Sequence, residues 1–75
     1  MYLYFKRSNG ELQLVDDNVE SDEVVFPIID KDIKRRNPNF KVYYIRTIHH
    51  EDCISYDVGS HTEFYYLSDK PMNVR

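Results

Sequence analysis

The residues best suited to metal chemistry lie in one short string. Residues 49–53 read HHEDC, so histidine, acidic and cysteine side chains follow one another directly, and His61 stands apart. A zinc site needs about four converging ligands, which usually come in pairs spaced two to four residues apart. Adjacent residues of an extended segment point in opposite directions. We therefore expect a solvated loop here and predict no metal site and no cofactor.

Cys53 is the one side chain that could act as a strong nucleophile. A reactive thiolate needs positive charge or a helix N-terminus nearby, but Cys53 follows Glu51 and Asp52. The two glycines, Gly10 and Gly59, form no glycine-rich phosphate loop. The carboxylates fall in expected loops, without an apolar pocket that would raise a carboxyl pKa. We predict that the protein is not an enzyme and takes no small-molecule substrate.

Tyrosine is unusually frequent, at seven of 75 residues. Its ring suits a half-buried strand position, and exposed tyrosine together with arginine is typical of interface hot spots. We therefore expect a surface that binds a protein partner or a second copy of the chain. The candidate contact residues are two tyrosines, an arginine near one of them and the basic end of a predicted helix: Tyr43, Tyr66, Arg46, Lys34, Arg35 and Arg36.

The basic residues leave a second class of function open. Aromatic rings beside lysine and arginine can stack nucleic-acid bases, so the basic helix end could contact DNA or RNA. The net charge of -3 favours this class less, because affinity for a polyanion rises with the number of cations. A third alternative is an acidic inhibitor that imitates phosphate groups. In size and charge alone, the chain resembles phage-encoded inhibitors of host nucleases.

Length and composition limit the protein to one small domain, residues 1–75. A chain of this size buries only about 60 to 65% of its unfolded surface, so a partner chain would add usefully to its stability. The single cysteine fits a reducing compartment. No leader peptide and no stretch of about 18 apolar residues is visible. We therefore expect a cytoplasmic protein without a membrane segment.

The first expected element is a β-hairpin around Asn9 and Gly10. This dipeptide favours a two-residue type I′ turn, in which both central residues have positive φ. Such a turn sets the register of the two strands, and side chains then alternate between the two faces. The predicted pairs are Arg7 with Leu12, Phe5 with Leu14, Tyr4 with Val15 and Leu3 with Asp16. Leu3, Phe5, Leu12 and Leu14 would face the core.

A helix is predicted from about Pro27 to Arg36. The acidic residues 16–23 read as a connection that residues 24–26 could extend as a short edge strand. Ile29 and Ile33 are four residues apart and would pack on the sheet, and residues 37–38, Asn-Pro, would end the helix. Because the opposite side of the helix would be wet, we expect Arg35→Glu combined with Arg36→Glu to leave folding intact.

The remaining chain predicts a three-stranded meander. Residues 40–48 are rich in β-branched and aromatic side chains of both parities, which is typical of a central strand covered on both faces. Residues 49–52 form a loop, and residues 53–58 alternate as a strand whose buried face carries Ile54, Tyr56 and Val58. Residues 59–62 form a second loop, residues 63–67 the last strand, and residues 68–75 a fraying tail.

The predicted fold class is α+β, with an antiparallel sheet of about five strands and one short helix on one face. Ten helical residues cannot cover both faces of a sheet this rich in apolar side chains. Large apolar patches are seldom left in water. Either the sheet curls into a half-barrel, or a second chain packs on the remaining face or on an exposed strand edge.

Overall fold

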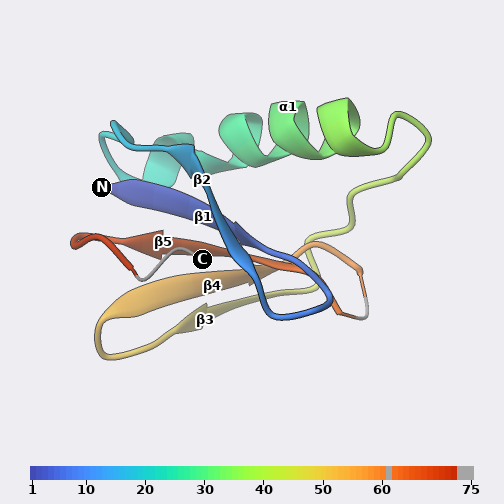
Figure 1. Ribbon diagram of the computed structural model, residues 1–75. Helices are drawn as coiled ribbons and strands as arrows, with labels where there is room; N and C mark the ends of the chain where they lie inside the picture. The colour runs from blue at the N-terminus through green and yellow to red at the C-terminus, as the bar shows by residue number, and fades with distance from the viewer. Residues whose placement is uncertain (61, 73–75) are drawn as a thin grey trace.

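The computed structural model describes residues 1–60 and 62–72 as one antiparallel sheet with a helix lying across one face (Figure 1). The strand order is β2-β1-β5-β4-β3. This confirms the predicted α+β class and its order of hairpin, helix and meander. The elements are β1 (Tyr2–Lys6), β2 (Leu12–Asp16), a 3-10 turn η1 (Asp22–Val24), α1 (Val25–Arg36), β3 (Arg46–His49), β4 (Cys53–Asp57) and β5 (Phe64–Ser68).

The hydrophobic core lies between α1 and the sheet. Ile29 and Ile33 point from the helix to the sheet as their four-residue spacing predicts, and Val25 extends the same stripe by one turn. The sheet contributes alternate residues of its central strands to this core, and among them Leu3 and Tyr65 are fully buried. The core cluster is Leu3, Phe5, Val19, Val25, Ile29, Ile33, Tyr56, Val58, Tyr65 and Leu67.

The helix begins two residues earlier than predicted. Residues 24–26 do not form an edge strand, because η1 leads directly into α1 at Val25. Pro27 therefore occupies the first turn, where a backbone N–H has no partner within the helix. The helix ends at Arg36, and Asn37 N–H donates to Ile33 C=O over 2.8 Å. In the described part of the chain, no helix has the length and apolar character needed to cross a membrane.

The turn of the first hairpin differs from the prediction. Gly10 N–H donates to Arg7 C=O, and Arg7 N–H donates to Glu11 C=O, so the loop has three residues. Gly10 has a φ of 89°, whereas Asn9 does not have positive φ. This is a type I turn followed by a glycine bulge, the common three-residue hairpin, and not a type I′ turn.

The extra loop residue shifts the register by one and reverses the faces of β2. Lys6 pairs with Leu12, and Tyr4 pairs with Leu14. Leu12 and Leu14 therefore lie on the face away from the helix, and not in the core as predicted, because a one-residue slip turns every side chain over. A second irregularity beside Leu3 restores its predicted pairing with Asp16.

The stretch 40–48 is not a central strand. Its last residues enter β3, which is an edge strand, and the central strand of the sheet is β5. Ile45 N–H donates to Asp57 C=O while Arg46 pairs with the same Asp57, so a bulge separates the two halves of the stretch. Before the bulge, Tyr44 packs edge to face on Phe26 of α1, with ring centroids 4.6 Å apart. The aromatic side chains predicted to fill both faces of a central strand instead line the rim of the sheet.

The C-terminal meander follows the predicted order. β4 buries Tyr56, Val58 lies just beyond it in the core, and Ile54 packs against the core, as the alternation indicates. Ser68, placed in the tail by the sequence, is the last residue of β5. Met72 N–H donates to the Tyr4 hydroxyl oxygen over 2.8 Å, which holds this part of the predicted tail against β1. Residues 73–75 and His61 lie outside the described residues.

Replacing Gly10 tests the hairpin. We expect Gly10→Val to lower the free energy of unfolding by more than about 1 kcal/mol, because a β-branched residue resists positive φ. No atom lies within 4 Å of a Cβ built at this position, so the loss would come from the backbone alone. Gly10→Asn is the matched control and should cost less, since asparagine tolerates this conformation. Urea unfolding measures both, and an unchanged midpoint for valine would contradict the turn.

Candidate functional site

The sheet face turned away from α1, called here the helix-free face, takes alternate residues from all five strands. Tyr4 pairs with Leu14 on one side and Tyr66 on the other, and Ser55 pairs with Tyr66 and Ile48. Directly paired residues project to the same side of a sheet. By these registers the face consists of Tyr2, Tyr4, Lys6, Leu12, Leu14, Arg46, Ile48, Cys53, Ser55, Asp57, Phe64, Tyr66 and Ser68.

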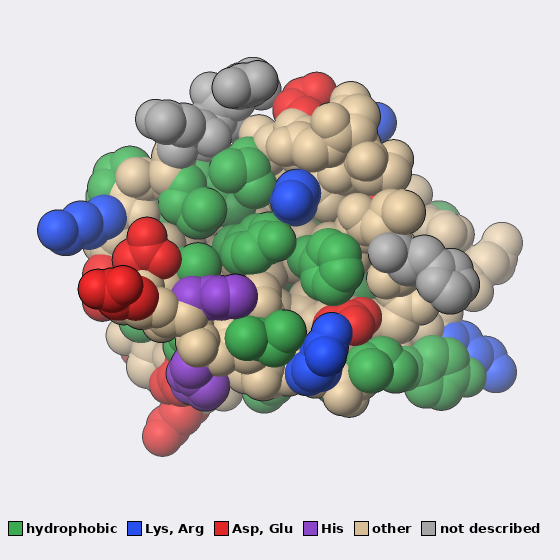
Figure 2. All heavy atoms as spheres, turned by 90° about the horizontal axis from the view of Figure 1, so that it is seen from below, with side chains coloured by type: hydrophobic (Ala, Val, Ile, Leu, Met, Phe, Trp, Pro, Cys, Tyr) green, Lys and Arg blue, Asp and Glu red, His purple; other side chains and the backbone are tan. Residues whose placement is uncertain are grey.

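Apolar side chains occupy the middle of the helix-free face. Figure 2 views the molecule from this side and shows hydrophobic side chains gathered across the sheet. Leu14 is 48% exposed. The others are half-buried by their neighbours: Tyr2, Leu12, Ile48, Phe64 and Tyr66. Tyr4 is only 2% exposed, and its hydroxyl accepts the bond from Met72. This face is therefore partly covered by the chain after β5, and apolar contact surface remains on β2, β3 and β5.

The six candidate contact residues divide into three groups. Tyr66 and Arg46 share the helix-free face, on β5 and β3. Tyr43 is 60% exposed and lies in the segment that leads into β3. Lys34, Arg35 and Arg36 lie in the last turn of α1, on the other side of the sheet. The structure therefore brings Tyr66 and Arg46 onto one surface and separates them from the basic helix end.

The two ends of the helix-free face differ in charge. One end row contains Lys6 and Arg46, with Asp57 between their strands. Beyond the opposite end lie three exposed carboxylates and one exposed ammonium group, from Glu51, Asp52, Asp69 and Lys70. Figure 2 shows acidic and histidine side chains side by side at its left-hand end. The face thus runs from a basic end, across an apolar middle, to an acidic end.

Three residues with reactive side chains lie together on this face. His50 Nε2 is 3.0 Å from Ser55 Oγ, a distance at which a histidine can hydrogen-bond a nucleophilic hydroxyl. Among the described residues, no hydrogen bond orients the other ring nitrogen of His50. Burial, followed by the nearby Asp52 carboxylate, raises the pKa of the Cys53 thiol. Within the described part of the chain, no group of His, Cys, Asp and Glu is placed to hold a metal ion.

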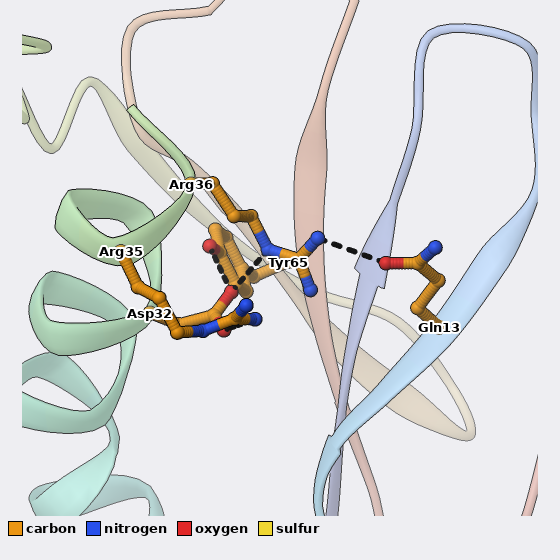
Figure 3. A network of polar contacts seen from close by, with 5 residues as sticks. All are labelled: Gln13, Asp32, Arg35, Arg36 and Tyr65. Atoms are coloured by element: carbon orange, nitrogen blue, oxygen red, sulfur yellow. Dashed lines mark hydrogen bonds and ion pairs between the residues drawn. The ribbon is translucent and has the colours of Figure 1, made fainter. Parts of the chain in front are cut away.

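A buried carboxylate joins the helix to the sheet (Figure 3). Asp32 is 6% exposed and accepts a hydrogen bond from the Tyr65 hydroxyl of β5 over 2.7 Å. Its two oxygens also accept bonds from Arg36 Nε over 2.6 Å and from Arg35 Nη2 over 2.8 Å. Arg36 Nη1 in turn donates to the side-chain oxygen of Gln13 on β2 over 2.8 Å. One network therefore fixes the last turns of α1 to a central strand and an edge strand.

Electrostatics explains why Asp32 can remain charged in this position. Burial raises the pKa of its carboxyl group, but hydrogen bonds from Arg36, Tyr65 and Arg35 outweigh burial and hold that pKa below its ordinary value. Burial and the hydrogen bond to the same carboxylate raise the pKa of Tyr65. Asp32 is thus an anion and Tyr65 a neutral donor across the ordinary pH range.

Sequence reasoning missed Asp32 as a buried residue. Two signals were available: Asp32 lies beside Ile33 on the buried stripe, and it precedes Arg35 and Arg36 by three and four residues, the spacing at which helical side chains pair. Neither signal specifies Tyr65, because that contact crosses 33 positions of the chain.

The structure also corrects the expectation that both arginines are dispensable for folding. The Arg35 side chain is 67% exposed, but that of Arg36 is only 22% exposed. The Arg36 guanidinium lies over the Phe5 ring, 4.1 Å from its centroid. Arg36 is therefore packed against the core as well as paired.

Two single charge reversals separate these roles. We expect Arg36→Glu to lower the free energy of unfolding by about 2 to 4 kcal/mol, because it leaves Asp32 buried beside a like charge. Arg35→Glu should cost less than about 1 kcal/mol, since that side chain is mostly in water. Urea unfolding at neutral pH measures both variants. Equal losses would show that the network does not distinguish the two arginines.

Acid unfolding tests the charge on Asp32. Because its folded pKa is lowered, its stabilising contribution is present above the ordinary value of 3.8 and is lost as pH falls through the folded pKa. We therefore expect Asp32→Asn to be less stable than the parent at pH about 7 and the difference to narrow toward pH about 2. Unfolding free energies of the two proteins across this range provide the measurement. A difference that stays constant or widens on acidification contradicts an ionised Asp32.

Comparisons of the chain with models of known protein families, with curated proteins and with solved structures gave no significant match. The chemistry of the described residues is therefore the basis for assigning a function. Within the described residues it offers one partly apolar sheet face with charged ends, two outer strand edges, on β2 and β3, and one internal ion network.

Proposed function

We propose that this protein acts by binding protein, without catalytic chemistry, and that its helix-free face binds a second copy of the chain. The observation that carries the proposal is the apolar middle of that face, which α1 does not cover. Sheets commonly bury such a face against a second sheet about 10 Å away, with interdigitating side chains.

The size of the face sets the expected affinity. Five strands about 4.8 Å apart and five residues long span about 24 by 16 Å, or roughly 400 Å² in projection. The corrugated side-chain surface is larger than this projection. A standard interface buries about 800 Å² per partner. Self-association on this face therefore falls at the small end of stable interfaces, and we expect a dissociation constant in the micromolar range.

The charges on the face favour one arrangement of the two copies. A two-fold axis in the plane of the interface and perpendicular to the strands stacks each strand on its own copy in the reverse direction. Lys6 would then lie near Asp69 of the partner copy, and Arg46 would lie near Glu51 of the partner copy. An axis parallel to the strands would instead stack basic end on basic end. Like charges placed opposite each other oppose association, so we expect the reversed arrangement.

Two further features support a binding role over a catalytic one. Cys53 is half-buried with a raised thiol pKa, which makes it a poor nucleophile. Ser55, which pairs with His50, is only 6% exposed, so its hydroxyl is poorly accessible to a substrate. A single free cysteine also fits the reducing cytoplasm, where we place the protein.

Nucleic-acid binding through the basic helix end stays a prediction with less support. The Arg36 guanidinium already donates to Asp32 and Gln13 and lies over the Phe5 ring, and Arg35 donates to the same Asp32 carboxylate. This leaves Lys34 as the member of that group outside the Asp32 network. Tight, salt-sensitive mobility shifts with DNA or RNA would favour this alternative. The acidic nuclease inhibitor also stays a prediction, and inhibition of a nuclease would test it.

Sedimentation equilibrium between about 1 μM and 1 mM chain tests the proposed self-association. We expect a monomer–dimer equilibrium that Leu14→Asp weakens by at least about tenfold, because it places a charge in the apolar contact. Val24→Asp is the matched control: Val24 is 41% exposed, similar to Leu14 at 48%, but lies in η1. A monomer over the whole range, or equal effects of the two variants, contradicts the proposal.

The reversed arrangement has its own test. Lys6→Glu and Asp69→Lys should each weaken dimerisation, and the double variant should regain part of the loss. A recovery of this kind shows that the two positions face each other across the interface. Salt should weaken the parent dimer modestly, since these charges lie at the rim. Losses that simply add would contradict the reversed arrangement.

A further inference from the structure

The outer edge of β3 is the second surface with unused binding capacity. β3 ends the strand order, so in residues 1–60 and 62–72 no strand pairs with its outer side. His50 N–H donates to Cys53 C=O over 2.8 Å, which sets the phase of the ladder between β3 and β4. Antiparallel strands alternate the direction of their amides. The amides of Thr47 and His49 therefore point away from β4, at exposed positions.

Exposed apolar side chains flank this edge. Ile45 is 64% exposed and Tyr43 is 60% exposed, the two highest values among the large hydrophobic residues described. Both precede β3 in an extended segment whose Tyr43 and Ile45 amides bond to the end of β4. An added strand would therefore find main-chain donors along β3 and apolar contacts beside it.

The charge of the segment indicates what kind of strand fits. Residues 40–50 contain Lys41 and Arg46 and no acidic residue, in a chain whose net charge is -3. Charged side chains on an edge strand discourage pairing with an identical edge. Two copies of β3 paired side by side would place two sets of Lys41 and Arg46 along one seam, without an acidic residue from residues 40–50. The same charges attract an acidic strand.

We propose that the outer edge of β3 binds an acidic, extended segment of a partner protein, which joins the sheet as a sixth strand. Main-chain hydrogen bonds supply the affinity in this mode of binding, and side chains at alternate positions supply the specificity. Lys41, Tyr43 and Ile45 alternate along one side of the segment, and the bulge brings Arg46 to the same side. The acidic residues of the partner face this side, beside Lys41 and Arg46. The proposed edge shares only Arg46 with the helix-free face, and the proposal does not depend on self-association.

A capped eight-residue peptide of alternating valine and glutamate is a suitable probe. Its control has lysine in place of every glutamate. We expect fluorescence anisotropy at low salt to show at least about fivefold tighter binding of the glutamate peptide, with the preference reduced at about 0.5 M salt. Amide hydrogen exchange should show new protection at Thr47 and His49. Equal affinity for the two peptides, or protection confined to β2, overturns the proposal.

Two variants locate the binding edge. Thr47→Pro removes an outward amide without removing a bond to β4, and proline is tolerated on the solvent side of an edge strand. Because main-chain hydrogen bonds supply the affinity, binding should fall at least about tenfold. Arg46→Glu should reverse the preference toward the lysine peptide, and it supplies the test should the proline variant fail to fold. An unreversed preference in a folded Arg46→Glu protein overturns the proposal.

Leu14→Asp keeps this test separate from self-association. That substitution lies on β2 and on the helix-free face, so it should leave peptide affinity unchanged. An equal loss of peptide binding in Leu14→Asp would place the peptide on the helix-free face and overturn the assignment to β3. Peptide binding by a protein that sediments as a monomer would support the β3 edge while contradicting the proposed dimer.

Discussion

In the described part of the chain, one helix of 12 residues lies against a five-stranded sheet, and it covers one face. This constraint determines most of what the molecule presents to its surroundings. The buried Asp32 holds α1 on this face of the sheet, because it connects α1 to β5 through Tyr65 and to β2 through Arg36 and Gln13. A helix that shifted along the sheet would leave this carboxylate buried without partners. The cost would be several kcal/mol, in a domain whose total free energy of unfolding is about 3 to 5 kcal/mol.

Two bulges then decide which side chains lie on the uncovered face. The glycine bulge at Gly10 turns Leu12 and Leu14 out of the core and turns Gln13 toward Arg36. The bulge at Ile45 and Arg46 separates Tyr44, which packs on the helix, from Ile48, which lies on the helix-free face. A single inserted residue thus moves two leucines from the predicted core to the predicted contact surface. The Gln13 contact with Arg36 exists only because of the same shift.

The sequence predicts the local elements better than their partners. Hairpin, helix and meander follow from the Asn-Gly dipeptide, the spacing of Ile29 and Ile33, and the alternation around Tyr56, all of which are properties of short windows. The turn type at Gly10 does not follow, because two-residue and three-residue loops both use glycine at positive φ. The position of residues 40–48 at an edge does not follow either, since aromatic residues suit a central strand and a rim that packs on a helix equally well. The burial of Asp32 does not follow from a short window of sequence, because its partner Tyr65 is distant in the sequence.

Charge distinguishes the helix-free face from the outer edge of β3. The helix-free face carries Lys6 and Arg46 at one end and acidic residues at the other, so a reversed copy presents opposite charges to each end. The β3 edge carries Lys41 and Arg46 without an acidic residue, so an identical edge presents the same charges to it. The charges of the helix-free face thus favour the proposed self-association, and those of the β3 edge favour the proposed acidic strand. Since Arg46 belongs to both surfaces, it is the residue through which occupation of one would affect the other.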